Sequence, residues 1–270
     1  MLLKEWINEN KTNFSHSDLQ FLLKELFGKE NIFTKDLILD NRRACLLDRT
    51  KKLYAKGMPI GYLLRKEEFF GLELMVNPSV LIPRPDTEVI TEKAIEVIKK
   101  NNLKNILDLC CGSANIAVSI KKSFPQRINM TASDINQKAL NVARSNIKAH
   151  KVNIKLTKSN LFAAFKGEKF DLIVSNPPYL KNSEIKGSLK YEPRMALSAG
   201  KDGLYFLGKI LKNAPVHLKE NGFLILEAGY RQKKHLELIL EKTGKYEIIE
   251  WINDYGANFR GVVLRKNSKL

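Results

Sequence analysis

The 270-residue sequence has no long hydrophobic stretch. None of its apolar runs reaches the roughly 18 to 20 residues that a helix needs to cross a bilayer. The first ten residues, MLLKEWINEN, carry charges where a secretory signal needs an apolar segment. These two absences predict a cytoplasmic protein that neither enters nor spans a membrane.

Cysteine is also scarce, since the chain contains only Cys45, Cys110 and Cys111. Their spacing forms neither a disulfide framework nor a zinc-binding pattern, and it suits a reducing compartment. We therefore expect no metal site. The adjacent pair Cys110 and Cys111 is interpreted as small apolar packing rather than as a reactive centre.

Acidic residues are fewer than basic ones, 29 against 46, and the net charge is +17. One interpretation is attraction to an acidic partner such as nucleic acid, a ribonucleoprotein or an acidic protein. The other is biased composition, because the lysines form no dense block and acidic residues lie among them. Nucleic-acid contact is therefore compatible with the charge but not required by it. We expect a monomer.

The first part of the chain is predicted to be helical. Ser17 can cap a helix, with Gln20 at the capping-box spacing, and Gly28 suits the end of that helix. Thr34 is a candidate cap for a second short helix. A third helix is expected over 41–56, because Gly57 and Pro59 follow it.

The pattern changes at residues 67–76, EEFFGLELMV, where aromatic and aliphatic residues flank a central glycine. This composition favours a β-hairpin that joins two domains. The segment VLIPRPDTE follows, and either Asp86 or Thr87 is expected to cap a helix that runs to about Lys100.

Strands and helices then alternate, which predicts an α/β fold with a mainly parallel sheet covered on both faces. Strands are expected at 105–110, 128–134, 153–160, 170–176, 222–229, 246–252 and 259–265, with helices at 113–123, 137–149, 202–219 and 231–242. Only the short segment DYGAN joins the last two strands, so these two should pair antiparallel.

Small residues follow the first of these strands, in the sequence DLCCGSAN. Ligands of open α/β sheets bind at the carboxyl ends of strands, and Gly112, Ser113 and Ala114 let backbone amides approach a ligand closely. The next strand ends at Asp134, which can bind both hydroxyls of a ribose. NAD is disfavoured because its three-glycine fingerprint is missing. S-adenosylmethionine fits better because it has no phosphate, and Asp108 could help to hold its ammonium group.

The fourth strand ends in Asn176, Pro177, Pro178 and Tyr179. A planar nitrogen can give one hydrogen to Asn176 and another to the carbonyl of Pro177, which the prolines hold in place. Tyr179 offers a flat face for stacking. The arrangement suits methyl transfer to nitrogen, where positioning is the main catalytic contribution and no ionised base is needed beforehand.

The chain resembles the HemK/PrmC family, protein-(glutamine-N5) methyltransferases of peptide-chain release factors. The resemblance covers nearly the whole chain. Its motifs are MPIGYLL, EEFFGLEL, VLIPRPDTE, ILDLCCGSA, ASDINQKALNVARSN, FDLIVSNPPYL, YEPRMAL, GKDGL and DYGANFRGVV. The combination of VLIPRPDTE, NPPY and YEPRMAL is highly specific.

The resemblance implies a Rossmann-like class I S-adenosylmethionine-dependent methyltransferase sheet at 79–270. It also implies a helical substrate-recognition domain at 1–64 and a hairpin linker at 65–78. The substrate would be the glutamine of the GGQ motif of release factors, bound by Asn176 to Tyr179. The residues implied for the cofactor are Cys110, Cys111, Gly112, Ser113, Ala114, Asp134, Asn160, Leu161 and Asn176, with Arg84 and Glu88 bracing the site.

The sequence departs from the family pattern at several positions. The usual loop is D-L-G-T-G-S-G, and here Cys110 and Ala114 replace two glycines. A positive φ at Ala114 would cost about 1 kcal/mol or more. Asn160 stands where aspartate is usual, and LEAG replaces LEIG or LEVG. Two alternatives remain open: an N6-adenine or rRNA base methyltransferase, and a non-catalytic protein that has lost cofactor affinity.

Overall fold

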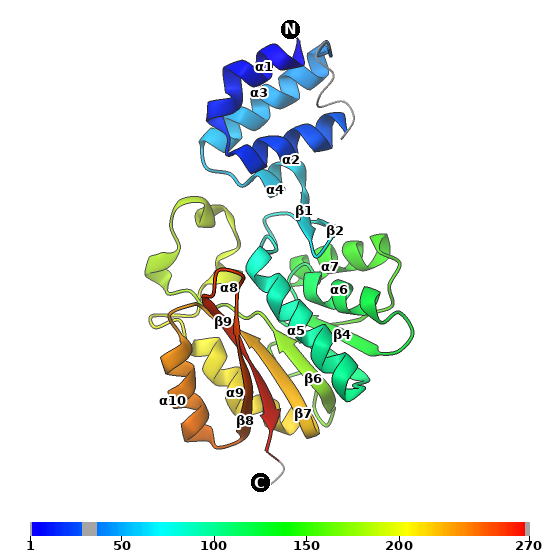
Figure 1. Cartoon of the computed structure of the whole chain (residues 1–270), viewed down its shortest axis with the longest axis vertical. Coiled ribbons are helices and arrows are strands. Elements are labelled where there is room, and N and C mark those ends of the chain that lie inside the picture. The colour runs from blue at the N-terminus through cyan, green and yellow to red at the C-terminus, as the bar shows by residue number, and fades with distance from the viewer. Residues whose placement is uncertain (1, 29–36, 268–270) are drawn as a thin grey trace.

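The computed structural model describes residues 2–28 and 37–267. Figure 1 shows a helical body at the N-terminus, a short hairpin beneath it and a larger α/β body. The helical body contains α1 (Leu3–Asn10), the 3-10 helix η1 (Lys11–Asn13), α2 (His16–Phe27), α3 (Asn41–Ala55) and α4 (Ile60–Leu64). These elements share an apolar core of their own. The domain boundaries expected between residues 64 and 65 and between residues 78 and 79 remain predictions.

The cap of α2 differs from the predicted one. Ser15, not Ser17, is the N-cap, and its Oγ accepts a hydrogen bond of 3.1 Å from the Asp18 amide. Ser17 lies inside the helix. Gly28 ends it with φ of 76°, which confirms the predicted exit. Thr34 lies outside the described residues.

The predicted hairpin is confirmed as β1 (Lys66–Phe69) paired antiparallel with β2 (Leu72–Met75). Its two-residue turn, Phe70 and Gly71, has positive φ at both positions, 53° and 68°. Two positive φ angles are what a tight hairpin turn of type I′ requires. Glu88 fixes this turn, because its Oε1 accepts a 2.7 Å hydrogen bond from the Phe70 amide.

A seven-stranded sheet forms the larger body, in the order β5-β4-β3-β6-β7-β9-β8. The first five strands are parallel, and β9 is antiparallel to both neighbours, as predicted. The strands are β3 (Asn105–Leu109), β4 (Asn129–Asp134), β5 (Lys155–Lys158), β6 (Phe170–Ser175), β7 (Leu218–Glu227), β8 (Tyr246–Asn253) and β9 (Phe259–Lys266).

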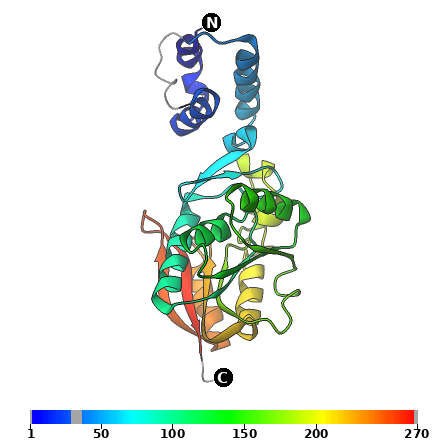
Figure 2. The ribbon, with the colours of Figure 1, turned by 90° about the vertical axis from the view of Figure 1, so that its right-hand side faces the viewer.

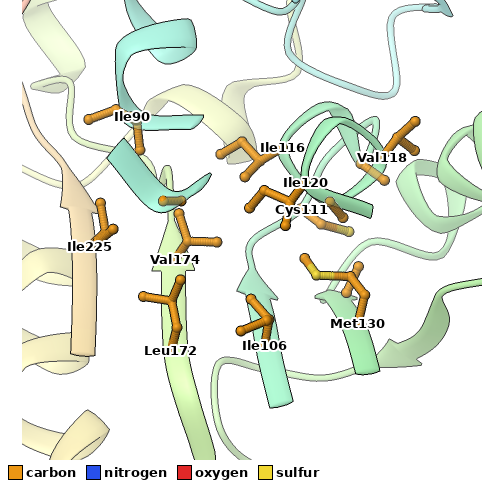
Figure 3. Packing of buried hydrophobic residues seen from close by; sticks show 14 of the residues in the cluster. Ile90, Ile106, Cys111, Ile116, Val118, Ile120, Met130, Leu172, Val174 and Ile225 are labelled. Carbon is orange, nitrogen blue, oxygen red and sulfur yellow. The ribbon is translucent and has the colours of Figure 1, made fainter. Parts of the chain in front are cut away.

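Helices cover both faces of the sheet, as the side view in Figure 2 shows. One face carries α5 (Pro85–Asn101), α6 (Asn115–Ser123) and α7 (Gln137–Ala149), and the other carries α9 (Tyr205–His217) and α10 (Lys233–Thr243). Successive side chains of a strand point to opposite faces. Ile106 therefore joins the cluster drawn in Figure 3, whereas Leu107 joins the cluster beneath α9.

The start of α5 also differs from the prediction. Neither Asp86 nor Thr87 caps it. Arg84 is the N-cap, without a side-chain cap, and Pro85 is the first helical residue. Proline suits that position because its missing N–H would have no partner inside the helix.

The long connection between β6 and α9 contains three short helices for which the sequence suggested no structure: η2 (Asn182–Glu184), η3 (Gly187–Tyr191) and α8 (Arg194–Leu197). It reaches the N-terminal body, since Tyr191 Oη donates a 2.7 Å hydrogen bond to the Lys56 carbonyl. Among the helices of the described residues, none is long and apolar enough to cross a membrane.

Candidate active site

A cavity of about 290 Å³ opens at the carboxyl ends of β3, β4 and β6. This is the place where open α/β sheets bind ligands, and the volume is just below the roughly 300 to 1,000 Å³ of small-molecule sites. Its wall is formed by residues within 79–87, 109–116, 133–139, 159–161, 176–178, 193–196 and 205–209.

The loop after β3 forms one side of the cavity through Cys110, Cys111, Gly112 and Ser113. Three alternate positions have left-handed backbone: Cys110 at φ 65°, Gly112 at 52° and Ala114 at 63°. Ala114 therefore takes the positive φ whose cost the sequence raised, and Cys110 takes one as well. The loop therefore keeps the backbone of a three-glycine turn although two of its residues have side chains.

The two cysteines of this loop are poor nucleophiles. Cys111 is buried, and burial raises the pKa of both thiols above the usual value. Because the thiolate is the reactive form, these side chains stay protonated near neutral pH. The Cys110 thiol forms part of the cavity wall, and Cys111 joins the core cluster shown in Figure 3.

Asp134 lies at the end of β4, beside this loop. Its Oδ2 accepts from the Gly112 amide at 3.0 Å, and its Oδ1 accepts from the Asn136 amide at 2.8 Å. Burial raises the pKa of Asp134, and the backbone donors oppose that rise. An ionised carboxylate has about four acceptor sites, so these donors do not use all of them. A carboxylate held rigidly in this way at the cavity wall can accept from the two hydroxyls of a ribose.

Asn160 and Leu161 line the cavity after β5. Ser159 shapes this turn, since its Oγ donates to the Leu161 carbonyl at 2.6 Å and accepts from the Ala164 amide at 3.0 Å. Leu161 takes a positive φ of 49°. Tyr205 and Phe206 of α9 also line the cavity, and nothing in the sequence analysis singled them out.

Asp108 is buried and is not part of the cavity wall. Its Oδ2 accepts from the Ala117 amide at 3.0 Å, and its Oδ1 has no hydrogen-bond partner among the described residues. Burial raises the pKa of Asp108 to about 7. The side chain therefore supports the start of α6 from behind the loop.

Asn176 follows β6 and reaches the cavity beside the loop. Its Nδ2 donates a 3.1 Å hydrogen bond to Thr87 Oγ1 at the start of α5. Because the NH₂ group is used in this way, the amide oxygen is the side that remains available to a ligand. The sequence pattern had indicated Thr87 only as a cap of α5.

The three residues after Asn176 differ in their position relative to the cavity. Pro178 is part of the cavity wall, whereas Pro177 and Tyr179 are not. In the hydrogen bonds of the described residues, no donor reaches the Pro177 carbonyl. The Pro177 carbonyl thus has no partner within the described residues, although Pro177 itself is buried outside the cavity wall.

Gln232 holds the end of this segment, and the sequence offered no signal for it. Its Nε2 donates to the carbonyls of Tyr179 and Gly203, both at 3.0 Å, and its Oε1 accepts from the Gly229 amide at 2.9 Å. A Cβ at Gly203 would lie 2.6 Å from the Tyr179 carbonyl oxygen. Glycine at 203 therefore lets the chain pass close to Tyr179.

Arg84 and Glu88 brace different parts of the molecule. Arg84 forms an ion pair with Glu192, whose Oε2 also accepts from the Ile82 amide at 3.1 Å. The pair joins the segments VLIPRPDTE and YEPRMAL across the cavity. Glu88 binds the hairpin turn instead, at Phe70.

Asn146 of α7 connects the hairpin with the loop after β3. Its amide exchanges two hydrogen bonds with the Met75 backbone, at 2.7 and 3.0 Å, and donates a third of 2.9 Å to the Ser113 carbonyl. The side chain is 1% exposed. It thus ties the linker to the cavity wall, a role that was not foreseen from the sequence.

Comparison with known proteins identifies the family. Residues 89–256 match the model of the methyltransferase small domain. A release factor glutamine methyltransferase of Borreliella burgdorferi is 39% identical over 276 aligned residues, which cover 98% of this chain and 94% of that protein. One from Clostridium botulinum is 36% identical, with 92% and 91% covered. The chain belongs to the release factor glutamine methyltransferase family.

Membership of this family confirms the predicted class, an S-adenosylmethionine-dependent methyltransferase. The fold agrees. A solved methyltransferase structure from Pyrococcus furiosus superposes with a TM-score of 0.53 at 20% identity, covering 84% of this chain and 98% of that one. The roles of the individual residues described above remain predictions.

Proposed function

We propose that this methyltransferase transfers a methyl group from S-adenosylmethionine to the side-chain amide nitrogen of the glutamine in the GGQ motif of peptide-chain release factors. The observation that carries the proposal is the orientation of Asn176, whose Nδ2 is held by Thr87 so that its oxygen is available at the cavity. The similarity to release factor glutamine methyltransferases over 98% of the chain favours glutamine as the source of the nitrogen.

The cavity residues suit the cofactor. Asp134 offers two carboxylate oxygens for the ribose, and Asn160 and Leu161 provide a polar and an apolar group for the adenine. The loop from Cys110 to Ser113 would hold the amino-acid end of the cofactor. S-adenosylmethionine supplies an electrophilic methyl group on a positively charged sulfur, so this chain need not generate an electrophile.

The chain's own contribution is to hold and orient a poor nucleophile. An amide nitrogen has a delocalised lone pair and reacts slowly unless it is placed in line with the methyl group. The Asn176 oxygen and the Pro177 carbonyl each accept a hydrogen bond from the NH₂ group of the substrate amide. The Tyr179 ring lies beside the planar amide group. The extra proton leaves after transfer, so no ionised base is required beforehand.

Two alternatives remain to be tested against this function. A base methyltransferase would use the same acceptors for an exocyclic amino group, and a base within a duplex would first have to be flipped out. A non-catalytic protein would follow if Cys110 and Ala114 weakened cofactor binding too far. The similarity to release factor glutamine methyltransferases over nearly the whole chain favours the first function over both.

One labelling experiment separates these functions. Purified protein is mixed with methyl-labelled S-adenosylmethionine and, in turn, release factor, release factor with its GGQ glutamine changed to alanine, tRNA, rRNA or DNA. We expect label only in the unchanged release factor. Label in nucleic acid alone would establish the base methyltransferase, and the absence of both label and cofactor binding would establish the non-catalytic protein.

The role of Asn176 is tested separately with Asn176→Ala. We expect transfer to fall by about 10²- to 10³-fold, the usual loss for one preorganised polar contact to a reacting group. Cofactor affinity should change little. Asn129→Ala, at the opposite end of the sheet, is the matched control. Transfer by Asn176→Ala near the control's rate would exclude the acceptor role.

A further inference from the structure

Glu227 is a buried carboxyl beside the proposed amide-binding residues, and the mechanism above does not use it. Ser175 and Leu226 are register partners in β6 and β7, so Asn176 and Glu227 come next along the two strands. The Glu227 side chain is 1% exposed, and its Oε2 has no hydrogen-bond partner within the described part of the chain.

Two polar side chains face this carboxyl: Tyr179, which follows the prolines after Asn176, and Thr87, which lines the cavity. Tyr179 Oη donates to Glu227 Oε1 at 3.3 Å. Thr87, which receives the Asn176 amide, is 1% exposed, and its hydroxyl lies close enough to the same carboxyl to lower the carboxyl's pKa. One carboxyl thus acts on both Thr87, which supports Asn176, and the hydroxyl of Tyr179.

Charged groups from two other elements also act on Glu227. Asp86 of α5 raises its pKa and Arg260 of β9 lowers it, while Thr87 and Tyr179 lower it as hydrogen-bond donors. Arg260 and Asp86 form an ion pair of 2.9 Å with each other. Burial is the largest influence and raises the pKa of Glu227 to about 7. The carboxyl can therefore change its charge near neutral pH.

We propose that Glu227 is a positioning residue that holds Asn176, through Thr87, and Tyr179 in the orientations that receive the glutamine amide. The inference rests on the proposed function, because it concerns the same site. It assigns to the glutamate of LEAG a task in substrate binding that is separate from cofactor binding.

The physical reason lies in the single hydrogen of the Thr87 hydroxyl. While the ionised Glu227 carboxylate accepts that hydrogen, Thr87 can only accept from Asn176, so the Asn176 oxygen must face the substrate. When Glu227 is protonated, Thr87 is free to donate to the Asn176 oxygen instead. The Asn176 amide can then turn and present its NH₂ group to the substrate NH₂ group, and two donors do not bind each other.

The pH dependence has a definite sign. The ionised form of Glu227 supports substrate binding, so kcat/KM for release factor should rise with pH through about 7 in the unaltered enzyme. Glu227→Gln, which stays neutral, should lose this rise, whereas any rise that comes from Asp108, whose pKa burial also raises to about 7, should remain.

Removal of the Glu227 carboxyl group tests whether this group positions Asn176 and Tyr179. Glu227→Met should lower kcat/KM at pH 8 by roughly 10- to 100-fold, the usual effect of losing a hydrogen bond to a buried group. Affinity for S-adenosylmethionine, measured by calorimetry, should be unchanged. The melting temperature at pH 8 should stay equal or rise, because a buried carboxylate with one unpartnered oxygen disappears. A purely structural role would instead lower the melting temperature together with the activity.

Thr87 provides the second arm of the experiment. Thr87→Val removes the hydroxyl at nearly constant size and should lower kcat/KM as Glu227→Met does. Thr87→Ser should retain more activity than Thr87→Val. In the double variant Thr87→Val/Glu227→Met, kcat/KM should be no lower than in either single variant, because both changes act through one contact. Glu247→Gln on the exposed edge strand β8 controls for the glutamate change.

Three results would overturn the inference: an unchanged pH profile for Glu227→Gln, wild-type kcat/KM for Glu227→Met, or strictly additive losses in the double variant. Failure of the proposed function looks different. In that case the unaltered enzyme itself would not label release factor, and the variants would have no activity to compare.

Discussion

The left-handed backbone of the loop after β3 predicts how the free energy of unfolding changes in two opposite substitutions, Gly112→Ala and Ala114→Gly. A non-glycine residue in this conformation costs about 1 to 2 kcal/mol. Alanine recovers about 0.4 to 1 kcal/mol through lower entropy of the unfolded chain. A Cβ on Gly112 would meet nothing within 4 Å, so no clash adds to the cost. Gly112→Ala should therefore lower the free energy of unfolding by about 1 kcal/mol.

The reverse change, Ala114→Gly, starts from φ of 63° and a fully buried methyl group. It relieves about 1 to 2 kcal/mol of backbone strain. It loses about 0.4 to 1 kcal/mol in unfolded-chain entropy and about 0.8 kcal/mol of methyl burial. These contributions nearly cancel, so the stability should stay within about 0.5 kcal/mol of the original.

Urea denaturation without cofactor measures both variants, from the midpoint and its slope. The loss for Gly112→Ala corresponds to about 2 to 4 °C in melting temperature for a domain of this size. Gly261→Ala is a steric control, since its Cβ would lie 2.4 Å from the Leu226 carbonyl oxygen and should destabilise far more. A neutral Gly112→Ala combined with a strongly destabilised Ala114→Gly would refute the reasoning from φ.

Three further changes probe the site. Asp134→Ala should mainly weaken S-adenosylmethionine binding in calorimetry, and unchanged affinity would contradict the ribose assignment. Gly203→Ala would place its Cβ 2.6 Å from the Tyr179 carbonyl oxygen, so kcat/KM for release factor should fall while cofactor affinity persists; wild-type activity would show that this approach is not needed. Asn146→Leu leaves the Ser113 carbonyl and the hairpin backbone without their partner, so thermal stability should drop by a few degrees, about 1 to 3 kcal/mol.

The charge of +17 also makes a prediction for kinetics. If it steers the enzyme to an acidic surface, kcat/KM should fall as salt rises and the Debye length shrinks from about 10 Å at 0.1 M. Rates that do not change with salt would favour biased composition as the source of the charge.

Local patterns in the sequence predicted most elements of the fold correctly. The alternation of apolar strands and helical segments, the hairpin glycine at 71 and the short DYGAN connection each reflect interactions between near neighbours in the chain. The errors were also local. The caps at Ser15 and Arg84 lie within two or three residues of the predicted ones, because several adjacent residues could serve as the cap.

What the sequence by itself determined is the class of the protein. It also predicted the positions proposed to carry the chemistry: the small-residue loop at Cys110 to Ala114, Asp134 at the next strand end, and the amide of Asn176. Only the tertiary structure decided how these groups are held. Thr87, Gln232 and Glu227 approach the NPPY segment from α5, α10 and β7, at sequence separations of about 50 to 90 residues. No local pattern records such contacts, because they arise when separate elements pack together at one end of the sheet.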